Sequence, residues 1–281
     1  MGAGVAIVTD SSAYLPAEDV DRHQITVVPL QVAIDGAVRT EGVDITAAEA
    51  ARALRAAHPI TTSRPSPERF AVAYRAAADA GADGIVSVHL SAALSGTVET
   101  ARLAAARAPV PVRVVDSHGI GMALGFAALA GAVAATAGAP LAEVAAAVET
   151  RARAARSLIY VDTLEHLRRG GRIGAAAGLL GSALMVKPLL HIVDGRVAPL
   201  EKVRTASRAL ARLEDLAVQH AADRVVDLAV QHMAAGGRAA ALAARLRERI
   251  PKVRDLYVGE VGPVIGAHAG PGMLGVVIAP P

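Results

Sequence analysis

The sequence predicts an α/β fold: an N-terminal, mostly parallel sheet with helices on both faces, followed by a C-terminal α+β domain with a mixed or antiparallel sheet. Short β-branched runs alternate with Ala-rich helical segments in the first half of the chain, and this alternation is typical of parallel sheets. In the second half a hairpin signal at Asp194-Gly195 lies among helices, which favours antiparallel pairing with helices on one face. We therefore predict two domains, residues 1–155 and 156–281.

Each predicted N-terminal strand is a short apolar run that ends in polar or turn-forming residues. The runs VAIVTD, ITVVPLQVAI, GIVSVHL and VRVVDS occupy residues 5–10, 25–34, 84–90 and 112–117. Asp35-Gly36 closes the second run as a hairpin-type turn. Open parallel sheets bind ligands beyond the carboxyl ends of their strands, so the residues that follow these strands are candidates for a binding site.

Capping signals mark where the N-terminal helices begin. Thr46 and Glu49 have the spacing of a capping box at the start of an Ala-rich helix. Ser66, followed by proline, is the expected N-cap of the next helix. Residues 61–63, between these helices, are expected to form a loop. Three more helices follow, the first of them ending near residue 108.

The C-terminal domain is predicted to begin with a strand and a short helix that Gly170-Gly171 stops. The strands of a hairpin then flank Asp194-Gly195, and these are followed by helices at residues 206–221 and 237–249 and by the strands RVVDLAV, LYVGEV and LGVVIA. The stretch GPVIGAHAGPGMLG, residues 262–275, is expected to be a rigid loop between the last two strands that positions His268.

The composition argues against several classes of function. The chain has no cysteine, which excludes disulfides, thiol nucleophiles and thiolate metal sites. Its nine histidines show no H-E-x-x-H motif, and the phosphate-loop and dinucleotide motifs are missing, so we expect no metal and no cofactor. A net charge of +3 and 2% aromatic residues argue against nucleic-acid binding.

The uncharged stretch at residues 119–142 is long enough to span a bilayer. It consists mainly of Ala and Gly, and Ala transfers only weakly into lipid, so we predict a helix buried within the protein and no stable membrane insertion. The N-terminal sequence MGAGVAIVTDSS lacks the basic and apolar regions of a signal peptide. We therefore expect a cytoplasmic protein.

The turn around Ser95 admits three interpretations. Ser95, Gly96 and Thr97 lie where the strand at residues 84–90 is followed by a helix. Unpaired amides at a helix N-terminus, beside hydroxyls and a glycine that permits close approach, favour an anion. Ser95 could instead only cap the helix. The third interpretation is a serine nucleophile with a histidine base, although the first glycine of G-x-S-x-G is missing.

Seven stretches, in order along nearly the whole chain, together resemble the DegV family of bacterial fatty-acid-binding proteins. They are VTDSSAYLP (8–16), TTSRPSP (61–67), LSGTVETA (94–101), VVDSHGIGMALG (114–125), VDTLEHLRRGGRIG (161–174), KPLLHIVDGRV (187–197) and GPVIGAHAGPGMLG (262–275). Each motif alone is weak, but the ordered set is specific.

The resemblance implies two α/β domains that bury one long-chain fatty acid, such as palmitate, between them, and a carrier that is not an enzyme. The positions that match the carboxylate-binding pattern of the family are Thr62, Ser63, Ser95, Gly96, His268 and Arg172. Members of the family present the carboxylate to a separate fatty acid kinase, which phosphorylates it using ATP. The resemblance therefore implies a kinase catalytic subunit as partner and a role in fatty acid transport or incorporation.

Two positions depart from the family pattern. Arg64 stands where glutamine is common, which changes the charge near the head group, and HGIGMALG (118–125) replaces a hydroxyl-rich continuation. The energetics agree with a fatty acid: each buried methylene contributes about 0.8 kcal/mol, so about sixteen carbons supply ample affinity. The buried carboxylate then needs hydrogen-bond donors, which the Ser95 turn offers.

Two other functions remain open from the sequence. An acyl- or ester-processing hydrolase or transferase would use Ser95 as nucleophile and His268 as base. A DNA-binding regulator would show salt-sensitive binding to duplexes. For the carrier, we expect a monomer or weak self-association.

Overall fold

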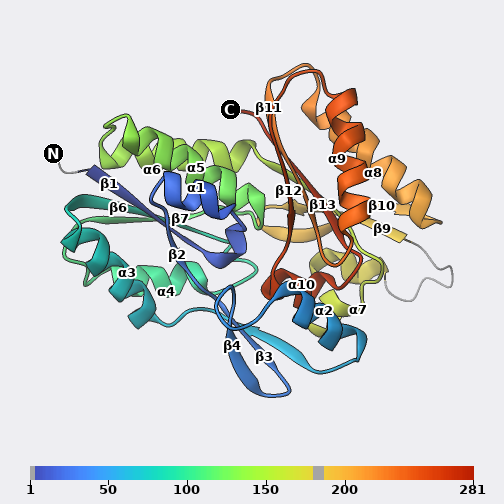
Figure 1. The fold of residues 1–281 in the computed structure, drawn as a ribbon, viewed down its shortest axis with the longest axis horizontal. Helices are drawn as coiled ribbons and strands as arrows, with labels where there is room; N and C mark the ends of the chain where they lie inside the picture. Colours follow the sequence, from blue (N-terminus) through green and yellow to red (C-terminus); the bar gives the residue numbers. More distant parts are fainter. Residues whose placement is uncertain (1–3, 180–186) are drawn as a thin grey trace. The chain divides into compact units, whose positions relative to one another are not determined.

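The computed structural model describes residues 4–179 and 187–281. Contacts between residues divide the chain into two compact units (Figure 1). Unit 1 comprises Met1–Gln31 and Ser63–Ala154, and unit 2 comprises Val32–Thr62 and Ala155–Pro281.

Unit 1 is built on a four-stranded sheet in the order β2-β1-β6-β7, and all of its strand pairs are parallel. Its strands are β1 (Gly4–Asp10), β2 (Thr26–Val28), β6 (Ala82–His89) and β7 (Val112–Asp116). Asp10 pairs with Val28, and His89 pairs with Asp116. The carboxyl ends of the strands therefore meet at one edge, as predicted, and the polar segments that follow them share that edge.

Helices cover both faces of this sheet, which confirms the predicted fold class (Figure 1). One face carries α3 (Pro67–Asp79) and α4 (Thr97–Ala105), and the other carries α5 (Met122–Thr136) and α6 (Leu141–Ala154). The short η1 (Ser11–Ala13) and α1 (Ala17–Arg22) follow β1. The uncharged stretch at residues 119–142 forms mainly α5, most of whose side chains are buried. No helix among the described residues is long and apolar enough to cross a membrane.

The predicted strand at residues 25–34 is in fact two strands that belong to different sheets. β2 ends at Val28, and β3 (Gln31–Ile34) begins after Pro29 and Leu30. Proline has no N–H to donate to a neighbouring strand, so the ladder ends there. β3 lies in a three-stranded sheet of order β4-β3-β5.

Residues 32–62 correct the predicted domain boundary, because they pack with the C-terminal part of the chain. They contain β3, β4 (Ala37–Thr40), α2 (Ala47–Arg55) and β5 (Ile60–Ser63). Helix α2 packs against α10 (Pro263–Ala269), and the buried Glu41 carboxylate accepts a hydrogen bond from the Val264 amide at 2.8 Å. This long-range contact leaves no local signal in the sequence.

The local predictions for residues 32–62 are confirmed, apart from the loop at 61–63. Asp35 and Gly36 have φ angles of 50° and 82°, as a two-residue hairpin turn requires. Thr46 and Glu49 form the predicted capping box. Residues 61–63, in contrast, belong to strand β5 rather than to a loop.

Unit 2 is built on a six-stranded mixed sheet in the order β10-β9-β8-β13-β11-β12. Only β11–β12 is a parallel pair among the described strands of this sheet. The strands are β8 (Arg156–Tyr160), β9 (Lys187–Val193), β10 (Arg196–Val203), β11 (Val226–His232), β12 (Val253–Glu260) and β13 (Leu274–Ala279). Asp194 and Gly195 form the predicted hairpin turn, with φ angles of 48° and 74°.

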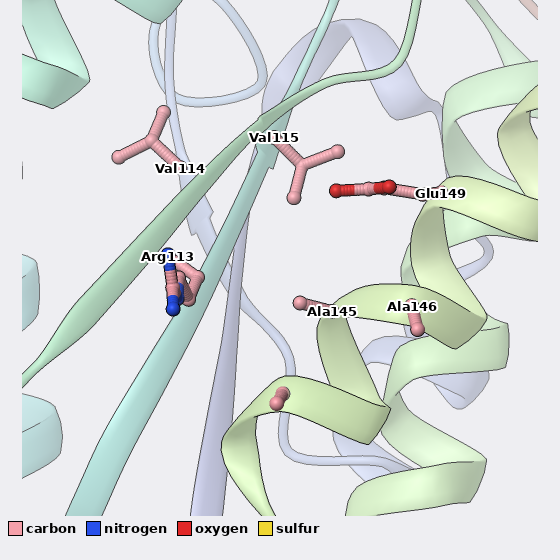
Figure 2. A pocket seen from close by; sticks show the side chains of 7 residues that line it. Arg113, Val114, Val115, Ala145, Ala146 and Glu149 are labelled. Atoms are coloured by element: carbon pink, nitrogen blue, oxygen red, sulfur yellow. The ribbon is translucent and has the colours of Figure 1, made fainter.

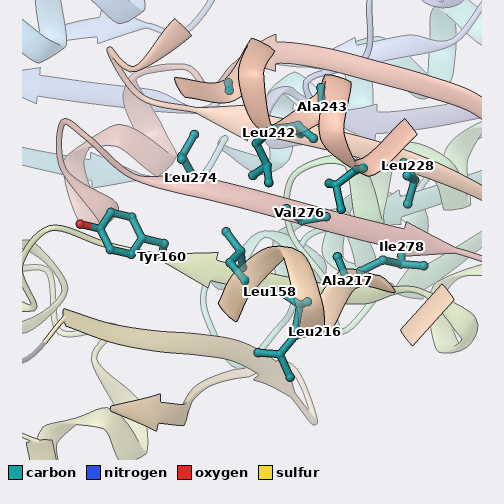
Figure 3. Close-up of a cluster of buried hydrophobic side chains, with 14 of the residues drawn as sticks. Leu158, Tyr160, Leu216, Ala217, Leu228, Leu242, Ala243, Leu274, Val276 and Ile278 are labelled. Atoms are coloured by element: carbon teal, nitrogen blue, oxygen red, sulfur yellow. The ribbon is translucent and has the colours of Figure 1, made fainter. Parts of the chain in front are cut away.

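Two long helices, α8 (Ala206–Ala221) and α9 (Gly236–Arg249), pack on this sheet and enclose its core. In Figure 3 their leucines meet those of the strands, among them Leu158, Leu242 and Leu274. The remaining elements are α7 (Glu165–Arg169), η2 (Gly174–Leu179) and α10.

The loop predicted at residues 262–275 is wrong in its first half, which forms helix α10. Pro263 occupies the first position of the helix, where its missing N–H costs nothing, and Gly270 ends it with a φ of 79°. His268 lies in the last turn of this helix. A helix holds a side chain more rigidly than a loop, so the structure fixes His268 more firmly than the predicted loop would.

Candidate functional site

In unit 1 the segment between β6 and α4 is a compact turn. The Ser91 carbonyl accepts hydrogen bonds from the amides of Leu94 at 2.9 Å and Ser95 at 3.1 Å. The Ser95 and Thr97 hydroxyls are 2.9 Å apart, and Gly96 is the N-cap residue of α4. The first amides of α4 have no helical partners and form the positive end of the helix. The turn therefore presents hydroxyl and amide donors together.

The buried carboxylate of Asp10 holds the base of this turn. One oxygen accepts hydrogen bonds from the Ser12 amide at 3.1 Å and the Ser12 hydroxyl at 2.5 Å. The other accepts from the Leu90 amide at 3.0 Å and from Nδ1 of His89 at 3.1 Å. Asp10, Ser12 and His89 are completely buried. A buried carboxylate is tolerated only when donors replace its lost water, and here four donors do so.

A chain of hydrogen bonds extends from Asp10 into the core. Because a carboxylate only accepts, Nδ1 of His89 carries the hydrogen, and Nε2 then accepts from the Ser87 hydroxyl at 2.7 Å. Ser87 in turn accepts from the Tyr74 hydroxyl at 2.8 Å. Burial raises the pKa of Tyr74 to about 12, so this phenol remains a donor. In each of these hydrogen bonds the donated hydrogen points along the series toward Asp10.

This network was not predicted from the sequence, although the network contains the residue types of a serine hydrolase triad. Ser87, His89 and Asp10 are wholly buried, and the Ser87 hydroxyl is engaged on both sides. This burial and these internal hydrogen bonds favour a structural role for the network, which holds the segments after β1 and β6 in position. A signal did exist: Ser87 and His89 alternate onto one face of β6, and β1, which ends at Asp10, is its neighbour.

The side chain of Arg64 covers Gly96. A Cβ atom built on Gly96 would lie 3.0 Å from Cζ and 3.1 Å from Cδ of Arg64, and closer still to Nη1. Both residues belong to unit 1. The position at which the chain departs from the family pattern is therefore in contact with the predicted anion-binding turn.

Unit 2 brings together three other predicted residues, Thr62, His268 and Arg172. Nε2 of His268 is 2.9 Å from the Thr62 hydroxyl. Its Nδ1 is buried and has no hydrogen-bond partner among the described residues. Burial, together with the positive charge of Arg172, lowers the pKa of His268 to about 4. The imidazole is therefore neutral at neutral pH.

Two glycines allow the histidines of α7 and α10 to pack against each other's helix ends. A Cβ atom on Gly170, after α7, would lie 2.7 Å from Cε1 of His268. A Cβ atom on Gly270, after α10, would lie 2.8 Å from Nε2 of His166. Burial lowers the pKa of His166 as well. This reciprocal packing accounts for the glycines of both motifs and fixes the His268 ring.

The remaining predicted residues have ordinary structural partners. Ser63, at the end of β5, lies 3.4 Å from the side-chain oxygen of Gln31 within unit 1. Nη1 of Arg172 donates to the Gly170 carbonyl at 2.7 Å. Ser95 has Thr97 as its side-chain hydrogen-bond partner, and no histidine bonds to it among the described residues. Among the residues that the structure describes, no group of three or more acidic or histidine residues could hold a metal ion.

Two cavities within unit 1 do not involve the predicted residues. One, of about 320 Å³, lies between β7 and α6 and is lined by Arg113, Val115 and Glu149 among others (Figure 2). The other, of about 720 Å³, lies at the amino-terminal edge of the sheet and includes Gly4 and Ala82 in its lining. Neither lies at the carboxyl edge, where the Ser95 turn is found.

Comparisons with known proteins show similarity over nearly the whole chain. A family model described as "Uncharacterised protein, DegV family" matches residues 4–281. A DegV domain-containing protein of Streptomyces coelicolor is 58% identical over 279 residues, which are 99% of each chain.

Solved structures show the same fold. A structure from Thermus thermophilus, reported as fatty acid binding of a DegV family protein, has a TM-score of 0.93 and 34% identity, covering 99% of this chain and 100% of the other. DegV of Bacillus subtilis, described as a fatty acid binding protein, has a TM-score of 0.91 and 31% identity, with both chains fully covered.

Asp10→Asn is expected to destabilise the protein by about 1.5–3 kcal/mol, because an amide NH₂ would face donors that now bond to a carboxylate. Urea unfolding followed by circular dichroism measures this change. Asp21→Asn, an exposed substitution on α1, is the matched control and should change stability by less than about 0.5 kcal/mol. Equal effects of the two substitutions would contradict the role given to Asp10.

Lowering the pH is expected to destabilise unit 2 through His268. Its folded pKa of about 4 lies below the ordinary 6.5, so between these values the unfolded chain binds a proton that the folded chain excludes. Stability is thus complete above pH 6.5 and declines as the pH falls toward 4. In His268→Gln the slope of unfolding free energy against pH should fall by up to about 1.4 kcal/mol per pH unit. An unchanged slope would refute this assignment.

Proposed function

Because the chain belongs to the DegV family, we propose that it is a carrier that binds one long-chain fatty acid and catalyses no reaction itself. The observation that carries the proposal is the likeness, at a TM-score of 0.93 and 34% identity, to a DegV family protein reported to bind fatty acid. The donor-rich turn around Ser95 supports it independently, since such a turn suits an anionic head group.

In this proposal the acyl chain is buried between the two units, and donors from both bind the carboxylate. These donors are the residues matched by the family pattern: Thr62, Ser63, Ser95, Gly96, His268 and Arg172. The methylenes supply the affinity, at about 0.8 kcal/mol each. The donors offset the cost of removing the carboxylate from water, which would otherwise cancel much of this gain.

The neutral state of His268 suits this role. If Nε2 carries the hydrogen, His268 donates to the Thr62 oxygen, 2.9 Å away. The hydroxyl hydrogen of Thr62 is then free to donate to the ligand. Arg172, whose charge reaches His268, adds a positive field for an anion. Thr62 thus offers a hydrogen to the carboxylate and Arg172 offers positive charge, while His268 orients the Thr62 hydroxyl.

We also propose a partner, a fatty acid kinase catalytic subunit. The resemblance to the family implies that the bound carboxylate is presented to this kinase, which phosphorylates it using ATP for fatty acid transport or incorporation. A carrier of this kind needs a head group at a polar turn and no nucleophile of its own. The contacts of Ser95 agree, because its hydroxyl is paired with Thr97 rather than with a base.

The enzymatic alternative requires Ser95 to be activated. A serine nucleophile needs a base within hydrogen-bond reach, and the described partner of His268 Nε2 is Thr62. The alternative therefore gains no support from the contacts within either unit. Ester hydrolysis by the purified chain, lost in Ser95→Ala, would establish it in place of the carrier.

Native mass spectrometry of the protein purified from the expressing cell tests the carrier function directly. We expect about one fatty acid for each chain, since an apolar tail of about sixteen carbons binds tightly enough to survive purification. The delipidated protein should then take up added palmitate or oleate. Recovery of no lipid, together with no uptake, would refute the proposal.

Ser95→Ala is expected to weaken fatty acid binding by about 1–3 kcal/mol, because the carboxylate loses one donor while it stays buried. Competition with a fluorescent fatty acid measures the affinity. Ser66→Ala, which removes an exposed hydroxyl at the start of α3, is the control and should leave the affinity unchanged. The head group lies elsewhere if the two variants bind equally well.

A further inference from the structure

Arg64 is an exposed residue between β5 and α3 whose side chain lies on the anion-binding turn. Three of its atoms, Nη1, Cζ and Cδ, lie within 3.1 Å of the point where a Cβ atom of Gly96 would be. The Arg64 side chain thus occupies the space into which a side chain at position 96 would project. Glycine at this position leaves the space that the guanidinium occupies.

The guanidinium of Arg64 has no hydrogen bond or ion pair among the described residues, and in this it differs from several other arginines of the chain. Arg212 binds both oxygens of Glu201, and Arg254 binds both oxygens of Asp227. Arg64 instead lies beside the N-terminus of α4, whose helix dipole repels a cation. An anion bound at the turn would attract both the Arg64 guanidinium and the N-terminus of α4, and would thereby offset their repulsion.

We infer that Arg64 is a specificity-determining residue that adds a positive charge to the head-group site and thereby selects an ionised carboxylate over a neutral head group. The inference rests on the proposed function, which supplies the fatty acid. The geometry supports it, since Arg64, the Ser95 hydroxyl and the Gly96 amide all lie at one turn of unit 1. A planar guanidinium donates two parallel hydrogen bonds to a carboxylate.

The test compares palmitate with hexadecanol, which has the same chain length and no charge. Affinities of the delipidated full-length protein are measured by competition with a fluorescent fatty acid at about 0.01 M and about 1 M salt, where the Debye lengths are about 30 Å and 3 Å. At low salt, Arg64→Gln should bind palmitate about three- to fivefold more weakly, in the upper range for solvent-exposed ion pairs. The difference should shrink at high salt, and hexadecanol binding should not change.

Two further variants test whether the effect depends on the position of the Arg64 charge or only on the net charge of the protein. Arg69→Gln removes an exposed arginine of α3 and changes the net charge equally, so palmitate affinity should stay at the wild-type value. Gly96→Ala retains the turn amide and a permitted φ of −74° but displaces the Arg64 side chain. In that background Arg64→Gln should have no further effect.

The outcomes distinguish this inference from the proposed function. Suppose that the wild-type protein binds palmitate. If Arg64→Gln binds palmitate equally well, or if its affinities for palmitate and hexadecanol fall by the same factor, the inference is wrong and the carrier function stands. An equal loss of palmitate affinity in Arg69→Gln would also overturn it, because the effect would then be one of net charge. Failure of the wild-type protein to bind palmitate would refute the proposed function itself.

Discussion

The buried carboxylate of Asp10 is the interaction on which the carboxyl edge of unit 1 depends. A charge in the core is stable only if its donors are fixed, and the donors here come from Ser12, Leu90 and His89. Ser12 and Leu90 lie in the segments that leave β1 and β6. The need to satisfy one carboxylate therefore determines how two chain segments leave the sheet.

The same constraint reaches the turn around Ser95 and the segment between β7 and α5. From Leu90 the chain passes directly to Ser91, whose carbonyl accepts from the Ser95 amide and whose amide donates to the Gly119 carbonyl. The Ser12 carbonyl accepts from the Gly121 amide just before α5. The turn that carries the Ser95 hydroxyl is thus held by backbone hydrogen bonds that lead back to the buried Asp10 carboxylate.

The sequence predicted most features that local interactions determine, and it missed those that distant residues determine. Both Asp-Gly hairpins and the Thr46 capping box depend on a few neighbouring residues, and all three are present. The assignment of residues 32–62 to unit 2 depends on contacts such as Glu41 with Val264, more than two hundred residues away. Likewise, Asp10 and His89 are both visible as polar residues at strand ends, but only the β1–β6 pairing joins them.

The segment Thr62-Ser63-Arg64 links the two groups of predicted head-group residues through the chain itself. Thr62 belongs to unit 2 and is bonded to His268, whereas Arg64 belongs to unit 1 and covers Gly96. Residues two apart in a chain have Cα atoms no more than about 7 Å apart. Thr62 and Arg64 therefore stay close along the chain, although the contacts of Thr62 lie in unit 2 and those of Arg64 lie in unit 1. The sequence of this segment, a simple run of hydroxyl residues before an arginine, does not show that the chain passes from one unit to the other within it.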